Sequence, residues 1–108
     1  MRRVNEALRE VLSARIARGF KDPRIGFVTV TAVDTSPDLR HARVYVSVLG
    51  DESEREASLT GLQSSHGYLQ AELAKELRMK RTPTLRFEHD ESIDRAFRIS
   101  KLLEDNDS

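Results

Sequence analysis

The sequence of 108 residues contains no cysteine. This absence excludes disulfides, thiolate metal sites and cysteine nucleophiles, and it fits a reducing compartment. Only six residues are aromatic, too few for a broad platform on which bases could stack. No apolar run approaches the roughly 18 residues that a membrane span needs, and Met1–Glu6 leads into no signal-peptide core. We therefore expect a soluble, cytoplasmic protein.

The length corresponds to about one domain, with no room for a second core. The net charge is zero, which by itself argues against nucleic-acid binding. The charges are nevertheless unevenly distributed. Residues 1–24 carry seven basic and three acidic side chains, and residues 75–86 carry five and one. Two such segments indicate either solvated helix faces or a surface of positive potential.

Apolar residues recur at helical spacing in three regions. The first region ends at Gly19 and carries Val4, Leu8, Val11, Leu12 and Ile16. Arg15 lies inside this stripe, and we interpret it as a snorkelling side chain or as the edge of the stripe. Gly67 interrupts the second region, so we expect a kink between two helices. That region carries Leu59, Leu62, Leu69, Leu73 and Leu77. The third region follows Asp90-Glu91-Ser92 and carries Ile93, Ala96, Phe97, Ser100 and Leu103.

Alternation of apolar and polar residues predicts a hairpin of two antiparallel strands. Phe27–Val33 would place Val28, Val30 and Ala32 on one face, and His41–Leu49 would direct Ala42, Val44, Val46 and Val48 to the core. Ser36-Pro37-Asp38 supplies the turn. Pro83 opens a third strand, Thr84–His89, whose inward residues are Leu85, Phe87 and His89.

The predicted fold class follows from this order of elements. We expect an α+β fold in which helices cover a three-stranded mixed sheet. Residues 1–104 would form a single domain, and residues 105–108 a short acidic tail.

No arrangement of catalytic residues is evident. His41, His66 and His89 show no ligand spacing, and without cysteine no metal site is expected. Neither a phosphate-binding loop nor a nucleophile motif occurs. Ser64, Ser65 and His66 are neighbours in sequence, but an activated nucleophile also needs convergence in space. We therefore predict a protein that is not an enzyme and that uses no cofactor.

Several segments resemble a known family. A helix, a hairpin, two helices that meet at a glycine and a final strand follow the order of a type II KH domain. The most specific segments are Lys21-Asp22-Pro23-Arg24-Ile25-Gly26, the hairpin pieces Val33–Leu39 and Ala42–Val46, Gly67-Tyr68, and Arg81–Phe87 followed by Asp90–Ile93. Together they resemble the ribosome-binding factor A family over residues 2–104.

The resemblance implies a type II KH-like fold, α-β-β-α-(Gly kink)-α-β-α, and a non-catalytic assembly factor. Such a factor binds the free small (30S) ribosomal subunit, assists late 16S rRNA processing and maturation, and is linked to cold adaptation. The implied partners are the small subunit and 16S rRNA or its precursor, with no membrane and no small-molecule substrate. We expect a monomer.

The family has an Ala-x-Gly break between its two helices, where an ordinary KH domain clamps the nucleic-acid backbone with a GxxG loop. Here the stretch reads Ser65-His66-Gly67, so serine replaces the alanine. Its hydroxyl would either cap the next helix or lie where RNA binds.

We hypothesise an RNA-binding face built from the first helix and its exit, the helix break and the basic stretch that follows. Its basic residues would neutralise phosphates, and Gly67 would let the backbone approach closely. The helix that starts there would offer N–H groups to a phosphate. Tyr68 would either stack on an unpaired base or pack in a core or interface. The candidate residues are Arg2, Arg3, Arg9, Lys21, Arg24, Ser65, His66, Gly67, Tyr68, Lys75, Arg78, Lys80 and Arg81.

Two other readings remain open. The protein could be a module that docks to other proteins through an exposed sheet edge, and its binding would then respond little to salt. The third reading, a small hydrolase of ferredoxin-like build, lacks a plausible site in the sequence, and a turnover abolished by changing His66 or His89 would revive it.

Overall fold

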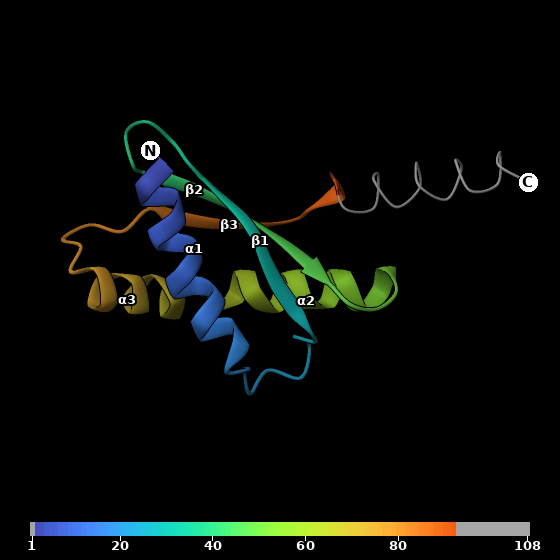
Figure 1. Cartoon of the computed structure of the whole chain (residues 1–108). Coiled ribbons are helices and arrows are strands. Elements are labelled where there is room, and N and C mark those ends of the chain that lie inside the picture. Colours follow the sequence, from blue (N-terminus) through green and yellow to red (C-terminus); the bar gives the residue numbers. More distant parts are fainter. Residues whose placement is uncertain (1, 93–108) are drawn as a thin grey trace, which may run out of the picture.

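The computed structural model describes residues 2–92, so the expected last helix and the acidic tail lie outside the described residues. Within them the chain forms six elements in the predicted order (Figure 1). These are α1 (Arg2–Ala17), β1 (Val28–Thr35), β2 (His41–Val48), α2 (Glu52–Ser64), α3 (His66–Leu77) and β3 (Thr84–His89). No helix within residues 2–92 is both long enough and apolar enough to cross a membrane.

The sheet has the strand order β1-β2-β3 and is mixed, as predicted. β2 pairs antiparallel with β1 and parallel with β3. A parallel pair needs a long crossover, and α2 and α3 supply it. Along β2, the alternate residues Ala42, Val44, Val46 and Val48 are buried, as predicted. The helices therefore cover one face of the sheet, and no helix within residues 2–92 covers the other face.

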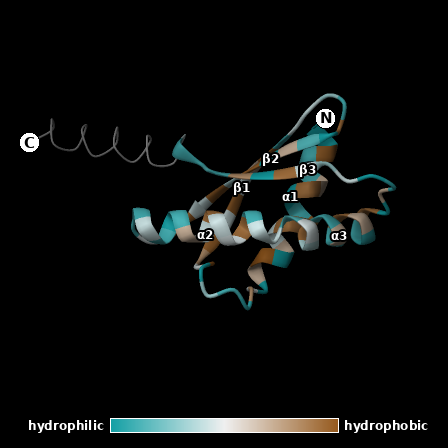
Figure 2. Cartoon of the chain, turned by 180° about the vertical axis from the view of Figure 1, so that it is seen from behind, coloured by the Kyte–Doolittle hydropathy of each residue, from teal (hydrophilic) through white to brown (hydrophobic). Residues whose placement is uncertain are grey.

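One hydrophobic core joins the helices to the covered face of the sheet. α1 packs chiefly on β1, whereas α2 and α3 pack on β3. Figure 2 shows hydrophobic residues concentrated on α1 and the strands, while the side of α2 turned to the viewer is largely hydrophilic. Among the fully buried side chains are Leu8, Leu12, Leu62, Leu69, Leu73 and Leu85.

β1 differs from its predicted form. It covers Val28–Thr35 instead of Phe27–Val33, and its register against β2 shifts between Val30 and Ala32. A β-bulge inserts one extra residue and so reverses the facing of the residues that follow. Val33 is therefore buried, while Ala32 is exposed. The prediction that Ala32 belongs to the core was wrong.

The turn of the hairpin is confirmed. The Leu39 N–H donates to the Ser36 carbonyl oxygen at 2.9 Å, so Pro37 takes the first central position. Leu39 has a φ of 62°, and the Ser36 N–H donates to the His41 carbonyl oxygen at 2.8 Å, which closes the loop.

The break between α2 and α3 lies at Ser65, two residues before its predicted place at Gly67. The Ser65 N–H still donates to the carbonyl oxygens of Gly61 (3.1 Å) and Leu62 (3.0 Å), so the chain bends with little unwinding. An N-cap hydroxyl normally needs an extended backbone, but Ser65 has φ −92° and ψ 8°. This explains why, within residues 2–92, its hydroxyl makes no cap hydrogen bond to α3.

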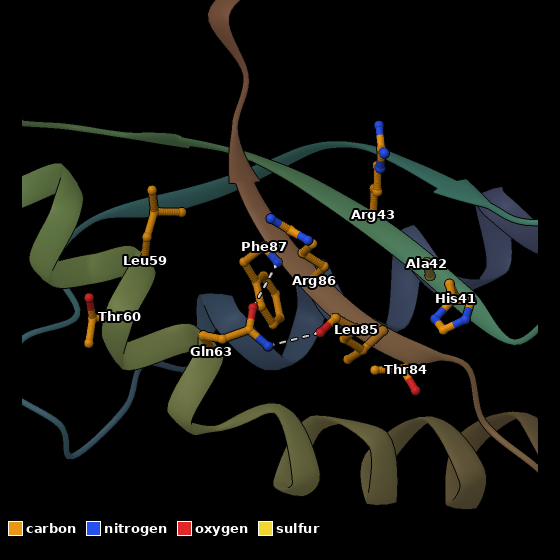
Figure 3. Close-up of a pocket in the computed structure, with 10 residues that line it drawn as sticks. All are labelled: His41, Ala42, Arg43, Leu59, Thr60, Gln63, Thr84, Leu85, Arg86 and Phe87. Atoms are coloured by element: carbon orange, nitrogen blue, oxygen red, sulfur yellow. Dashed lines mark hydrogen bonds between the residues drawn. The ribbon is translucent and has the colours of Figure 1, made fainter.

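Gln63, near the end of α2, covers the outer edge of β3 (Figure 3). Its side-chain amide donates to the Leu85 carbonyl oxygen at 3.0 Å, and its side-chain oxygen accepts from the Phe87 N–H at 3.1 Å. Leu85 and Phe87 are alternate residues, and such residues present a strand's free groups at its edge. One side chain thus replaces a neighbouring strand at this position.

Candidate nucleic-acid interface

Arg15 joins two of the predicted site segments, the exit of α1 and the helix break. Its Nε donates to Tyr68 Oη at 2.9 Å, and its Nη1 donates to the Gly19 carbonyl oxygen at 3.0 Å. The guanidinium carbon lies 4.8 Å from the centre of the Tyr68 ring and 5.1 Å from that of Phe20. Cation–π contacts of this kind act within about 6 Å of the ring centre.

Arg15 was not among the predicted site residues. The contact with Gly19 could have been predicted from the sequence, because an arginine four residues before a helix-ending glycine can reach the carbonyl groups there. The contact with Tyr68 spans 53 residues of sequence, so no local pattern predicts it. The half-buried Arg15 is therefore not a free snorkelling side chain, because its guanidinium is hydrogen-bonded within the protein.

Two of the predicted phosphate-binding arginines have carboxylate neighbours. Arg9 Nη2 lies 2.9 Å from Glu6 Oε2, and Arg24 Nη2 lies 2.6 Å from Asp22 Oδ2. The hydrogen bond from Arg24 holds the pKa of Asp22 below its usual value, and Arg9 does the same for Glu6. Both carboxylates are thus ionised at neutral pH, and they reduce the positive potential that these arginines offer.

The hypothesised positive face is divided in space. Glu10, Glu72 and Glu76 lie together in the groove where α1 meets α3. On one side of this groove lies the exit group, formed by Lys21 and Arg24 with the helix break (Ser65, His66, Gly67 and Tyr68). The α3-end group is formed by Lys75, Arg78, Lys80 and Arg81, of which Lys75 lies between Glu72 and Glu76 in α3 and the others follow that helix.

Arg2 and Arg3 are also far from the exit group. They begin α1, whose 16 residues span about 24 Å at about 1.5 Å per residue. Asn5 Oδ1 accepts from the Thr35 N–H at 3.0 Å, which places the start of α1 beside the hairpin turn (Figure 1). The Thr84 N–H donates to the Arg40 carbonyl oxygen at 2.8 Å and brings the loop before β3 to the same end. Arg2 and Arg3 therefore lie at the end of the molecule occupied by the α3-end group.

The helix break exposes His66, Gly67 and Tyr68, whereas Ser65 is half-buried. The His66 Nδ1 atom lies 2.8 Å from the Gln63 carbonyl oxygen. A Cβ atom at Gly67 would meet nothing within 4 Å, and Gly67 has no positive φ. The fold therefore does not require glycine here, and the open surface fits the predicted close approach of a ligand to the backbone.

Arg78 ends α3 in a left-handed conformation, with φ 52° and ψ 40°. Its N–H donates to the Ala74 carbonyl oxygen. Glycine is the usual residue at such a position, because a Cβ atom there costs about 1 kcal/mol. Arg78, Lys80 and Arg81 are all exposed.

A hollow of about 770 Å³ lies between α2 and the strands β2 and β3 (Figure 3). It is lined by Gln63, Phe87 and other residues, but by none of the predicted RNA-binding residues. His41 lines it, while His66 and His89 lie on α3 and β3. Within residues 2–92, no group of three or more His, Cys, Asp or Glu side chains is placed to hold a metal ion.

Comparisons with known proteins show the family and the fold of the chain. Residues 1–103 match the family model described as Ribosome-binding factor A. The chain is 55% identical over 102 residues to the ribosome-binding factor A of Anaeromyxobacter dehalogenans strain 2CP-C, which covers 94% of this chain and 74% of that protein.

Two sets of coordinates for a Thermus thermophilus protein are similar, each at 33% identity over 81% of this chain and 91% of the other. One is the crystal structure of its ribosome-binding factor A, with a TM-score of 0.71. The other is a homology model of that factor fitted into a cryo-EM map of its complex with the 30S subunit, with a TM-score of 0.68. The expected α+β fold with its mixed sheet agrees with these structures.

Proposed function

The chain belongs to the ribosome-binding factor A family, and we propose that it binds the free small (30S) ribosomal subunit. There it assists the late processing and maturation of 16S rRNA, in the cytoplasm and as part of cold adaptation. It acts as a monomer with one KH-like domain, residues 1–104, without catalysis and without a cofactor. The observation that carries this proposal is the family match over residues 1–103.

A factor without catalytic groups acts through binding energy alone. If it binds one arrangement of an RNA more tightly than another, it shifts their equilibrium by the difference in affinity. RNA helices rearrange more slowly in the cold, so such a factor matters most at low temperature. We propose that its preferred arrangement is a late form of the small subunit.

The surface of the described residues supports RNA as the partner. Arg78, Lys80 and Arg81 are exposed at the end of α3, where they can neutralise phosphates. The Ser65 hydroxyl does not cap α3, so it does not compete with a phosphate at the start of that helix. The open surface at Gly67 lets a backbone approach the same place.

Sedimentation of the protein with free small subunits, assembled ribosomes and naked 16S rRNA tests the proposal. We expect it to sediment with the free small subunit and to be released as salt is raised. A protein that sediments with none of these particles would contradict the proposal.

The salt series also separates RNA binding from docking to a protein. An apolar protein interface would release the factor little at high salt. At β3 the edge groups of Leu85 and Phe87 are already bonded to Gln63, which weighs against docking at that edge.

A further inference from the structure

A surface hollow of about 470 Å³ lies where the end of α1 meets the start of α3. Its volume falls within the range of about 300–1,000 Å³ that is typical of ligand sites. It is lined by three cationic residues, two aromatic residues and a glycine, namely Arg15, Arg18, Lys21, Phe20, Tyr68 and Gly19.

The chemistry of this hollow differs from that of the groove beside it. Of the residues that the structure describes, none that lines the hollow is acidic. The neighbouring groove between α1 and α3 shares Arg15 and Arg18 with the hollow, but it also contains the carboxylates of Glu10, Glu72 and Glu76. Cations bind phosphate, and aromatic rings stack on bases. The hollow carries both kinds of residue, whereas no aromatic residue lines the groove within residues 2–92.

Tyr68 is held in place for such a contact. Arg15 bonds its hydroxyl at 2.9 Å and lies 4.8 Å from its ring centre, yet 49% of the residue remains exposed. A ring fixed before binding loses less conformational entropy when a ligand stacks on it. Arg15 is therefore a positioning residue, and the exposed part of the Tyr68 ring is the contact surface.

Gly19 explains how the cations and rings come together. Its φ of 85° turns the chain sharply after α1, in a conformation that glycine adopts without strain. Phe20 then lies against the Arg15 guanidinium, and the exposed Arg18 and Lys21 stand on either side of the turn in sequence. A Cβ atom at Gly19 would meet nothing within 4 Å, so the turn leaves open space.

We propose that this hollow binds one unpaired nucleotide of single-stranded RNA. The base stacks on the exposed side of Tyr68, and a phosphate lies near Arg18 and Lys21. This inference rests on the proposed function and deepens it, because it names unpaired RNA as the part of the small subunit that the exit of α1 recognises. Duplex RNA keeps its bases stacked inside the helix and cannot offer one to Tyr68.

Equilibrium binding to a short single-stranded RNA and to a duplex of the same length tests the ring. Tyr68→Leu should weaken binding of the single strand about tenfold, since stacking on one base contributes about 1–3 kcal/mol. Phe27→Leu is the matched control, because Phe27 is 82% exposed but does not line the hollow. Equal affinities of wild type and Tyr68→Leu for the single strand would overturn the proposal.

Salt titration tests the cations. Arg18→Gln with Lys21→Gln should lower the slope of log affinity against log salt by about 0.7 for each phosphate that the variant no longer neutralises. The control is Arg43→Gln with Arg86→Gln. It removes two exposed arginines that lie opposite each other on β2 and β3, outside the hollow. If the salt slope is unchanged in Arg18→Gln with Lys21→Gln, or is lowered equally in the two double variants, Arg18 and Lys21 do not hold the phosphate and the proposal is contradicted.

Tyrosine fluorescence reports stacking directly, because the chain has two tyrosines and no tryptophan. In Tyr45→Phe only Tyr68 emits, and a stacked base should quench it. Adding Arg15→Gln should reduce both the quenching and the affinity, because Tyr68 is then no longer held. If the fluorescence of the Tyr45→Phe protein stays constant while single-stranded RNA is added to saturation, the proposal is overturned.

Binding to the free small subunit, measured in parallel, separates this inference from the proposed function. If the wild type binds the subunit and Tyr68→Leu binds naked single-stranded RNA equally well, the inference fails and the function stands. If Tyr68→Leu weakens only the binding to the subunit, the hollow holds a ribosomal protein, and the inference again fails. If the wild type binds neither the subunit nor RNA, both fail.

Discussion

The two basic segments of the chain present their charges in different ways. Residues 1–24 hold more basic residues, but Arg9 and Arg24 have carboxylate partners and Arg15 contacts aromatic rings. In residues 75–86, the exposed Arg78, Lys80 and Arg81 form no ion pair with any residue in the range 2–92. Arg86, in the same segment, lies 3.6 Å from Glu88 Oε1. The segment with fewer basic residues thus still offers three exposed cations without a paired carboxylate. A basic segment therefore contributes positive surface only through those cations that no neighbouring carboxylate contacts.

The largest effect is expected in the second segment. Arg78→Glu with Lys80→Glu should weaken binding to the free small subunit roughly 100-fold at low salt, because two phosphate contacts become repulsive. Sedimentation or a binding titration measures this, and circular dichroism checks that the fold is kept. Unchanged binding would show that the RNA-binding surface lies elsewhere.

Arg78→Gly should separate stability from binding. Glycine relieves the left-handed conformation at the end of α3, so the free energy of unfolding should rise by about 1 kcal/mol. Binding should weaken, because the α3-end group then has one cation fewer. Urea unfolding and a binding titration on the same variant measure the two effects, and a decrease in stability would contradict the role given to this position.

A matched neutralisation in the first segment should have a smaller effect. Arg9→Gln with Arg24→Gln should change binding less than about threefold, since Glu6 and Asp22 already offset these charges. Comparison with Arg78→Gln and Lys80→Gln keeps the number of charges removed the same. Equal decreases in affinity in the two double variants would contradict the inference that the paired arginines of residues 1–24 contribute less to binding than the cations of residues 75–86.

The smallest effect concerns pH. The pKa of Asp22 is lower in the folded chain because Arg24 hydrogen-bonds its carboxylate. Its contribution to stability is therefore present above the unfolded-state pKa of about 3.9 and is lost as pH falls through the lower, folded-state value. Asp22→Asn should make acid unfolding less steep below that pH, as followed by circular dichroism. An identical acid transition would contradict this role of the pair.

Local periodicity was enough to predict most of the fold. The alternating residues of β2 and the apolar stripe of α1 depend on neighbours within a few positions, so the sequence alone specifies them. The bulge in β1 depends on pairing with β2, and the helix break depends on how α2 and α3 pack. Ala32 and Gly67 were therefore placed incorrectly, although the types of element were correct.

The candidate site was harder to predict for the same reason. Lys21 and Tyr68 were both chosen, but the residue that connects their segments, Arg15, contacts a partner 53 residues away. Arg2 was chosen for its charge, yet it lies at the other end of α1 from Lys21. A linear charge count carries no information on which cations share a surface. Where the RNA binds remains a prediction for each of these residues.

The hydrogen bonds of Gln63 to the edge of β3 have a consequence for aggregation. A bare strand edge is a template on which a strand of another molecule can pair, and repeated pairing builds cross-β fibres. The Gln63 amide already bonds Leu85 and Phe87 at the middle of this edge. Since α2 precedes β3 along the chain, a ribosome synthesises this protection before the strand that it covers. The newly made protein can therefore fold with β3 shielded from its neighbours.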